Sequence, residues 1–124
     1  MPAMETLARG AHSLGLALSP DKLEQFEDFY RILVEWNQRL NLTTIMDYHE
    51  VQTKHFLDSL TVALALPEVT PGLRLLDLGS GAGLPGIPLK ILLHQMSLVL
   101  VDSVAKKAAF LRQAVASLKL EGVE

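Results

Sequence analysis

The sequence predicts an α/β protein, in which a helical N-terminal segment precedes the first half of a Rossmann-like domain. Three observations point to this fold. Residues 73–77 form an aliphatic run of strand type that ends in an acidic residue and continues through alternate glycines into a helix. A second aliphatic run, residues 98–101, also precedes an aspartate. Before residue 67, apolar residues recur mainly at helical spacing. We expect the two parts to be residues 1–70 and 71–124, with the second part incomplete.

Composition limits the class of protein. With 124 residues the chain is one domain at most, and 49% hydrophobic residues are enough for a core. There is no cysteine, and the four histidines lack metal-ligand spacing, so no metal site is predicted. No apolar segment approaches the roughly 20 residues that span a bilayer, and no signal-peptide pattern is present. We therefore expect a soluble cytoplasmic protein without membrane association. The net charge of −3 shows no excess of positive charge of the kind that is typical of nucleic-acid-binding proteins.

The first two helices are predicted from apolar spacing and end signals. Residues 4–14 have helical periodicity, with Gly15 as a stop. Ser19 can cap the second helix and Pro20 fits its first position. The apolar face of this second helix is expected to consist of Leu23, Phe26, Tyr30, Leu33, Trp36 and Leu40.

A third helix is predicted to start at Asp47, with Glu50 completing a capping box. Its expected face contains Val51, His55, Leu60 and Leu64, and Pro67 ends it. Pro71 and Gly72 then form a turn before the first strand.

The segment after that strand is a glycine-rich turn into a short helix that reaches about His94. Pro85 and Pro88 are interpreted as helix-start residues, because a helix interior rejects proline.

Ser103 is expected to cap the last helix, and Gly122 to stop it. The apolar face of that helix is expected to contain Val104, Ala108, Leu111, Val115 and Leu118.

The acidic residue before the glycines favours one nucleotide-like cofactor over another. Residues 81–86 fit the dinucleotide pattern G-x-G-x-x-G, which alone is weak evidence. The longer string, with Asp77 two residues before Gly79, resembles the first motif of Rossmann-like class I methyltransferases, which use S-adenosylmethionine (SAM). SAM carries an ammonium and a sulfonium group, which a carboxylate attracts, whereas the pyrophosphate of NAD would be repelled. Asp102 lies about 20 residues beyond the loop, where a carboxylate can bind ribose hydroxyls; helix capping is its alternative role.

Several longer segments resemble the RsmG (GidB) family. The string from Gly79 to Pro88 continues the glycines with Leu-Pro-Gly-Ile-Pro, which generic methyltransferases usually lack. Further matches are Trp36-Asn37 with Asn41-Leu42-Thr43, then Lys54-His55-Phe56-Leu57-Asp58-Ser59-Leu60, and Val101-Asp102-Ser103 with Lys106-Lys107 and Phe110-Leu111. The matches keep the family's order and run from about residue 16 to residue 122.

The resemblance implies transfer of a methyl group from SAM to N7 of a guanine in small-subunit (16S) ribosomal RNA, with the RNA or the ribosomal subunit as partner. It assigns a SAM pocket to Gly79, Ser80, Gly81, Gly83 and Leu84, with Asp77 near the methionine end, Asp102 on the ribose and Ser103 beside it. Asn41 and His55 match polar positions that are thought to face the reaction site. Their alternatives are structural: Asn41 ends a helix, and His55 pairs with Asp58 or Asn41. Lys106, Lys107, Arg112 and Lys119 form a basic helix face that is expected to be solvated.

The chain departs from this family by ending before the expected later strands. We therefore expect a fragment with two strands and unpaired edges, inactive alone or nearly so, and able to pair with a second copy at a sheet edge. Two other classes remain open from sequence: an NAD-dependent oxidoreductase and a non-catalytic module that binds RNA or the ribosome.

Overall fold

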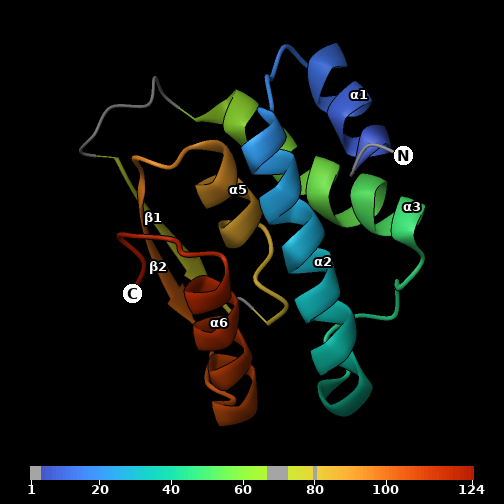
Figure 1. The fold of residues 1–124 in the computed structure, drawn as a ribbon. Coiled ribbons are helices and arrows are strands. Elements are labelled where there is room, and N and C mark those ends of the chain that lie inside the picture. Colours follow the sequence, from blue (N-terminus) through green and yellow to red (C-terminus); the bar gives the residue numbers. More distant parts are fainter. Residues whose placement is uncertain (1–3, 67–72, 80) are drawn as a thin grey trace.

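The computed structural model describes residues 4–66, 73–79 and 81–124. The predicted helix end at Pro67, the turn at Pro71 and Gly72, and the site residue Ser80 lie outside the described residues. The elements in chain order are α1 (Glu5–Ser13), α2 (Pro20–Leu40), α3 (Tyr48–Glu50), the π-helix η1 (Val51–Leu57), α4 (Asp58–Thr61), the 3₁₀-helix η2 (Val62–Ala65), β1 (Arg74–Leu78), α5 (Gly86–Leu92), β2 (Ser97–Val101) and α6 (Ala105–Ser117). The predicted incomplete α/β fold with a helical N-terminal part is confirmed (Figure 1).

The long helix α2 begins and ends as its sequence predicts. Ser19 Oγ accepts a hydrogen bond from the Lys22 N–H at 3.3 Å, and Pro20 occupies the first helical position. The helix ends at Leu40, and Asn41, the residue that follows, adopts a left-handed conformation with φ 52°. This C-terminal geometry is one that asparagine tolerates better than most side chains.

The core of the helical part is an aromatic cluster between α2 and η1. The Phe56 ring lies 5.1 Å from the Phe26 ring and 5.4 Å from the Phe29 ring, measured between centroids. All three rings are fully buried. Phe29 lies outside the predicted apolar face of α2, whereas Tyr30 and Trp36 of that face are only partly buried. One continuous core cluster includes residues from both sides of the predicted boundary at residue 70, which stays a prediction.

The helical stretch after Asp47 is less regular than predicted. Asp47 Oδ2 does accept a hydrogen bond from the Glu50 N–H at 3.1 Å, so the cap is confirmed. The chain then forms a π-helix rather than a continuous α-helix, and each π turn includes an extra residue. The buried face therefore includes Gln52 and Phe56, while Leu64 is exposed.

The two strands form a parallel sheet with β1 beside β2, in a register that pairs Arg74 with Ser97 and Leu78 with Val101. Residues Gly122 to Glu124 continue along the other edge of β2: Leu98 N–H donates to Gly122 O at 2.9 Å and Leu100 N–H to Glu124 O at 2.7 Å. The prediction that β2 has an unpaired edge is therefore wrong, because the chain returns beside it. No described residue forms a strand on the outer edge of β1.

Both ends of α6 differ from the prediction. Ser103 does not cap the helix; the cap position is Val104, and the Asp102 carboxylate accepts the Val104 N–H instead. Gly122 does not stop the helix either. The helix ends at Ser117, and Lys119 takes the left-handed conformation, which leaves Gly122 free to pair with β2.

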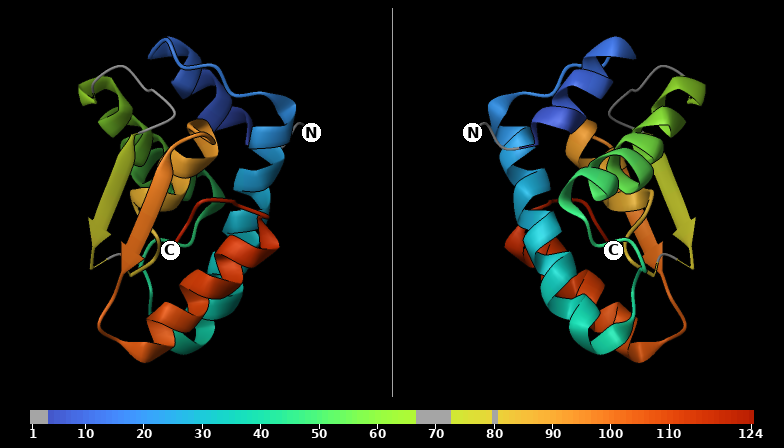
Figure 2. Two further views of the ribbon diagram at one scale, coloured as in Figure 1. Left: turned by 90° about the vertical axis from the view of Figure 1, so that its left-hand side faces the viewer. Right: turned by 90° about the vertical axis from the view of Figure 1, so that its right-hand side faces the viewer.

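Helix α5 lies on one face of the sheet and α2 and α6 lie beyond it, as the two side views show (Figure 2). On the opposite face the side chains of Leu76 and Leu78 are 58% and 71% exposed. In the described part of the chain, no helix has both the length and the apolar composition to cross a membrane.

Candidate functional site

The glycine loop begins where both strands end. Because the strands are parallel, their carboxyl ends meet at one edge of the sheet. The Gly79 N–H donates to Val101 O at 2.7 Å, which ties the start of the loop to the end of β2. Gly79, Gly81 and Gly83 have φ values of 68°, 50° and 83°, a region that side chains rarely adopt. The alternate glycines are therefore required by the backbone path.

The three glycines differ in what surrounds them. A Cβ added at Gly79 would meet no atom within 4 Å, and one at Gly81 would meet only Gly79 O at 3.9 Å. A Cβ at Gly83 would lie 2.6 Å from Ile87 Cδ1. Gly79 and Gly81 thus leave open space beside the backbone, where a ligand can approach, whereas Gly83 permits close packing of the loop on α5.

Asp102 connects this loop to the start of α6. Its Oδ2 accepts a hydrogen bond from the Gly81 N–H at 2.8 Å, and its Oδ1 accepts one from the Val104 N–H at 2.9 Å. These two backbone bonds, the Val104 bond first, hold the pKa of Asp102 below its ordinary value. The carboxylate is therefore ionised at neutral pH, and each oxygen retains a lone pair for a further donor.

Asp77 lies in a different environment. Its side chain is only 8% exposed, and its Oδ2 accepts a hydrogen bond from the Gly86 N–H at 3.0 Å. Burial raises the pKa of Asp77, and the Gly86 bond lowers it by less. Asp77 therefore contacts the start of α5 from the covered face of the sheet, beneath the glycine loop.

A separate cavity of about 240 Å³ lies between the loop and the helical part. It is lined by Lys54, His55, Asp58, Ser59, Val62, Leu84 and Pro85. The structure thus brings the predicted residues Leu84 and His55 to one cavity. Asn41 and Ser103 are both exposed and do not line it.

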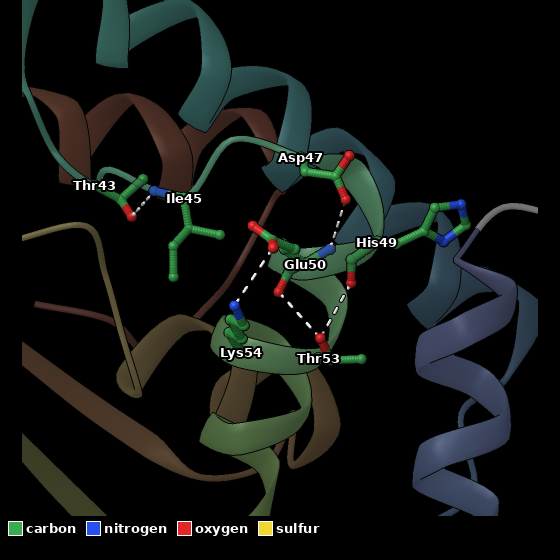
Figure 3. Close-up of polar contacts among 7 residues, drawn as sticks. All are labelled: Thr43, Ile45, Asp47, His49, Glu50, Thr53 and Lys54. Carbon is green, nitrogen blue, oxygen red and sulfur yellow. Dashed lines mark hydrogen bonds and ion pairs between the residues drawn. The ribbon is translucent and has the colours of Figure 1, made fainter.

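His55 has a hydrogen-bond partner that sequence reasoning misses. Its Nε2 lies 2.6 Å from Thr43 Oγ1. The same hydroxyl also accepts the Ile45 N–H at 3.1 Å, the bond drawn in Figure 3. Burial lowers the pKa of His55, so the imidazole is mostly neutral at pH 7, although the nearby Asp58 charge acts in the opposite direction. The hydrogen-bond partner of His55 is therefore Thr43 and not Asp58 or Asn41, while Asp58 acts on the imidazole through its charge. Spacing alone could not indicate Thr43, which lies twelve residues earlier in an irregular segment.

Lys54, which also lines this cavity, pairs with a residue one turn earlier. Its Nζ donates to Glu50 Oε1 at 3.4 Å, and Figure 3 shows the two side chains directed toward each other beside Asp47. The Glu50 side chain therefore pairs with Lys54. Both groups are exposed, so this pair stabilises the fold little.

The chain is similar to one family of known proteins. The sequence model described as "GidB: rRNA small subunit methyltransferase G" matches residues 22–124. Relatives named ribosomal RNA small subunit methyltransferase G include those of Roseiflexus castenholzii (52% identical over 97% of this chain), Pelotomaculum thermopropionicum (47% over 97%) and Myxococcus xanthus (48% over 96%). These alignments cover 50%, 50% and 54% of the relatives, so the chain spans about half their length. The chain belongs to the rRNA small subunit methyltransferase G (GidB) family.

Proposed function

We propose that this chain supplies the SAM-binding loop of an enzyme that methylates N7 of a guanine in small-subunit ribosomal RNA. The proposal depends chiefly on one observation: the backbone is bare and open at Gly79 and Gly81, between two strand ends that each have a carboxylate. The relatives are named as ribosomal RNA methyltransferases, which supports an enzyme that methylates RNA. The choice of guanine N7 rests on the family resemblance.

The residues present fit the cofactor. An added Cβ at Gly79 or Gly81 would enter open space, which is the space a nucleoside needs. In the proposal Asp102 accepts the ribose hydroxyls through its remaining lone pairs, and Gly81, Gly83 and Leu84 contact the rest of the nucleoside. Asp77 contributes negative charge near the methionine end, and Ser103 lies at the rim. SAM supplies an electrophilic methyl group when bound.

The chain's own residues then have positioning roles. Guanine N7 has a free lone pair and no proton, so its methylation needs no general base. Alignment of the two reactants is sufficient for a large rate gain. We assign His55, held neutral and oriented by Thr43, to the wall of the base pocket, where a neutral imidazole can donate or accept a hydrogen bond. Asn41 is retained as a second candidate at the exposed end of α2.

The 124 residues alone are proposed to bind SAM weakly and to methylate RNA poorly or not at all, because they match only half of each relative. Calorimetry with SAM measures the affinity. Tight binding would contradict this part of the proposal. The assignment of the glycine loop as the SAM site would not be affected.

Amide NMR spectra of the chain, titrated with SAM and separately with NAD, test the site itself. We expect SAM to shift the amide signals of Gly79, Gly81 and Val104, and NAD to shift none of them. The Gly81→Val variant should lose these shifts. Gly15→Val is the matched control, since Gly15 also has positive φ (79°) and open space but lies between α1 and α2. Shifts confined to other residues, or an equal response to NAD, would reject the SAM site.

A further inference from the structure

A shallow groove lies where the C-terminal end of α2 meets the N-terminal end of α6, apart from the glycine loop and the His55 cavity. Its volume is about 250 Å³, and it is lined by Trp36, Arg39, Leu40, Lys106 and Ala109. Three of these residues give an apolar wall and two are cations, with no acidic residue among them. This composition combines a surface for a flat apolar group with charges for an anion.

The indole of Trp36 is fixed in place by contacts on two sides. Its ring packs edge-on against Phe110, with centroids 6.0 Å apart and planes at 62°. The Arg39 guanidinium lies over the same ring at 5.3 Å from its centroid. Trp36 is only partly buried, so part of the ring contributes to the groove.

The two cations of the groove have no ion-pair partner among the residues that the structure describes. Arg9 and Arg31, in contrast, pair with Glu5 and Asp28 on their own helices. Arg39 and Lys106 come from different helices that the fold brings together, and both are exposed. An unpaired cation is available to an external anion without breaking an existing ion pair.

The groove is at the end of the molecule where the strands terminate. The arrowheads of β1 and β2, the end of α2 and the start of α6 all point to the lower part of the view (Figure 1). Lys106 follows Asp102, whose carboxylate anchors the glycine loop, by four residues. The groove and the loop are therefore connected by a short stretch of chain at the start of α6.

We propose that this groove binds single-stranded RNA, with a base against the apolar wall formed by Trp36, Leu40 and Ala109, and phosphates on Arg39 and Lys106. The inference rests on the proposed function and adds a binding surface on α2 and α6. Aromatic platforms flanked by cations are the common means by which proteins hold single-stranded nucleic acid. An acidic peptide would use the two cations and leave the apolar wall unfilled.

Trp36 makes the groove directly observable, because it is the only tryptophan of the chain. A short single-stranded RNA should quench Trp36 fluorescence on binding. Affinity is measured independently from the anisotropy of end-labelled RNA at several salt concentrations. The double variant R39Q/K106Q should weaken binding roughly threefold to tenfold and reduce the slope of log K against log salt by about 0.7 for each cation removed.

The double variant R9Q/R31Q is the matched control, since it removes two exposed arginines and leaves the groove intact. Circular dichroism checks that both variants fold. Equal loss of RNA affinity in the two variants, or RNA binding without quenching of Trp36, would overturn the proposal. Competition by poly-glutamate as strong as that by RNA would also overturn it and assign the surface to an acidic protein. The SAM titration by NMR is repeated on R39Q/K106Q. If the SAM-induced shifts persist while RNA binding does not behave as expected, the groove proposal fails and the cofactor site does not.

Discussion

The aromatic cluster of the helical part is buried within the chain, whereas apolar side chains on one face of the sheet are exposed. Phe26, Phe29 and Phe56 have no exposed surface, while Leu76 and Leu78 are more than half exposed. The three rings are therefore stabilised by burial and mutual packing. Among the described residues, helices pack on one face of this sheet, although parallel sheets usually have both faces covered. The buried core joins the helical part to α5 and α6, and the sheet supplies the geometry of the loop.

The largest expected effect is in the aromatic cluster. Phe56→Ala removes a fully buried ring that contacts Phe26 and Phe29, so we expect a loss of about 3–5 kcal/mol in the free energy of unfolding. Urea unfolding followed by circular dichroism measures it. Leu64→Ala is the control, because Leu64 is exposed on η2 and should change stability by less than about 0.5 kcal/mol. Similar losses in the free energy of unfolding for both variants would contradict the expected difference between a buried and an exposed side chain.

Gly86→Ala tests how closely α5 packs on the sheet. An added Cβ would lie 2.7 Å from Asp77 Oδ2 and 2.8 Å from Leu100 Cδ2. Asp77 is buried and bonded to the Gly86 N–H, so displacing these two side chains should cost about 1–3 kcal/mol. Gly10→Ala in α1 is the matched control. Its Cβ would approach only the Leu57 side chain, which can move, and alanine favours the helix by up to about 1 kcal/mol. In thermal unfolding, Gly86→Ala should lower the Tm by more than Gly10→Ala does. The reverse order would show that the sheet side has room to adjust.

The two aspartates predict pH effects of opposite sign. The pKa of Asp102 is lowered in the fold, so its stabilising contribution is present above its ordinary value of 3.8 and is lost as the pH falls. Asp102→Asn should therefore cost about 0.5–1.5 kcal/mol at pH 7 and progressively less toward pH 3. The pKa of Asp77 is raised, so its charged form opposes folding as the pH increases. Asp77→Asn should accordingly become less harmful relative to wild type between pH 4 and pH 7. Parallel pH profiles for the two variants would contradict this assignment.

The smallest effect on stability, and the most direct test of the open sheet, is Leu78→Ser. Leu78 is 71% exposed, so the free energy of unfolding should change by less than about 0.5 kcal/mol. Self-association should change more, since two copies that pair at the outer edge of β1 bring their apolar faces together. Sedimentation velocity at increasing concentration should show dimers for the wild type and fewer for Leu78→Ser, with Leu64→Ser unchanged. A wild-type chain that is monomeric at every concentration would reject the edge-dimer hypothesis.

The sequence predicts correctly those elements that are determined by the residues within them or next to them. Ser19 and Pro20 mark the start of α2, and the alternation of glycines after Asp77 marks the loop, because each residue acts through its own backbone or near neighbours. The π-helix at Val51–Leu57 has no comparable signal, since the same apolar residues fit an α-helical face. Its register depends on packing of Phe56 against α2, which is a tertiary contact.

Non-local contacts explain the remaining differences at the site. Gly122 is a reasonable helix stop in sequence, yet its carbonyl pairs with Leu98, and strand pairing cannot be read from one segment. The sequence does not predict the contact of Thr43 with His55, because Thr43 lies in an irregular segment. The candidate cofactor residues Gly79, Gly81 and Asp102 were nevertheless brought to one edge, as parallel strands require.

The hydrogen bonds of Asp102 have a consequence for communication across the molecule. One carboxylate bonds both to Gly81 in the cofactor loop and to Val104 at the base of the helix that bears Lys106. A ligand that displaces the loop must also disturb the helix start, and a ligand that shifts the helix must disturb the loop. Thermodynamic reciprocity then requires that RNA in the groove and a nucleoside in the loop alter each other's affinity by the same factor, if they alter it at all.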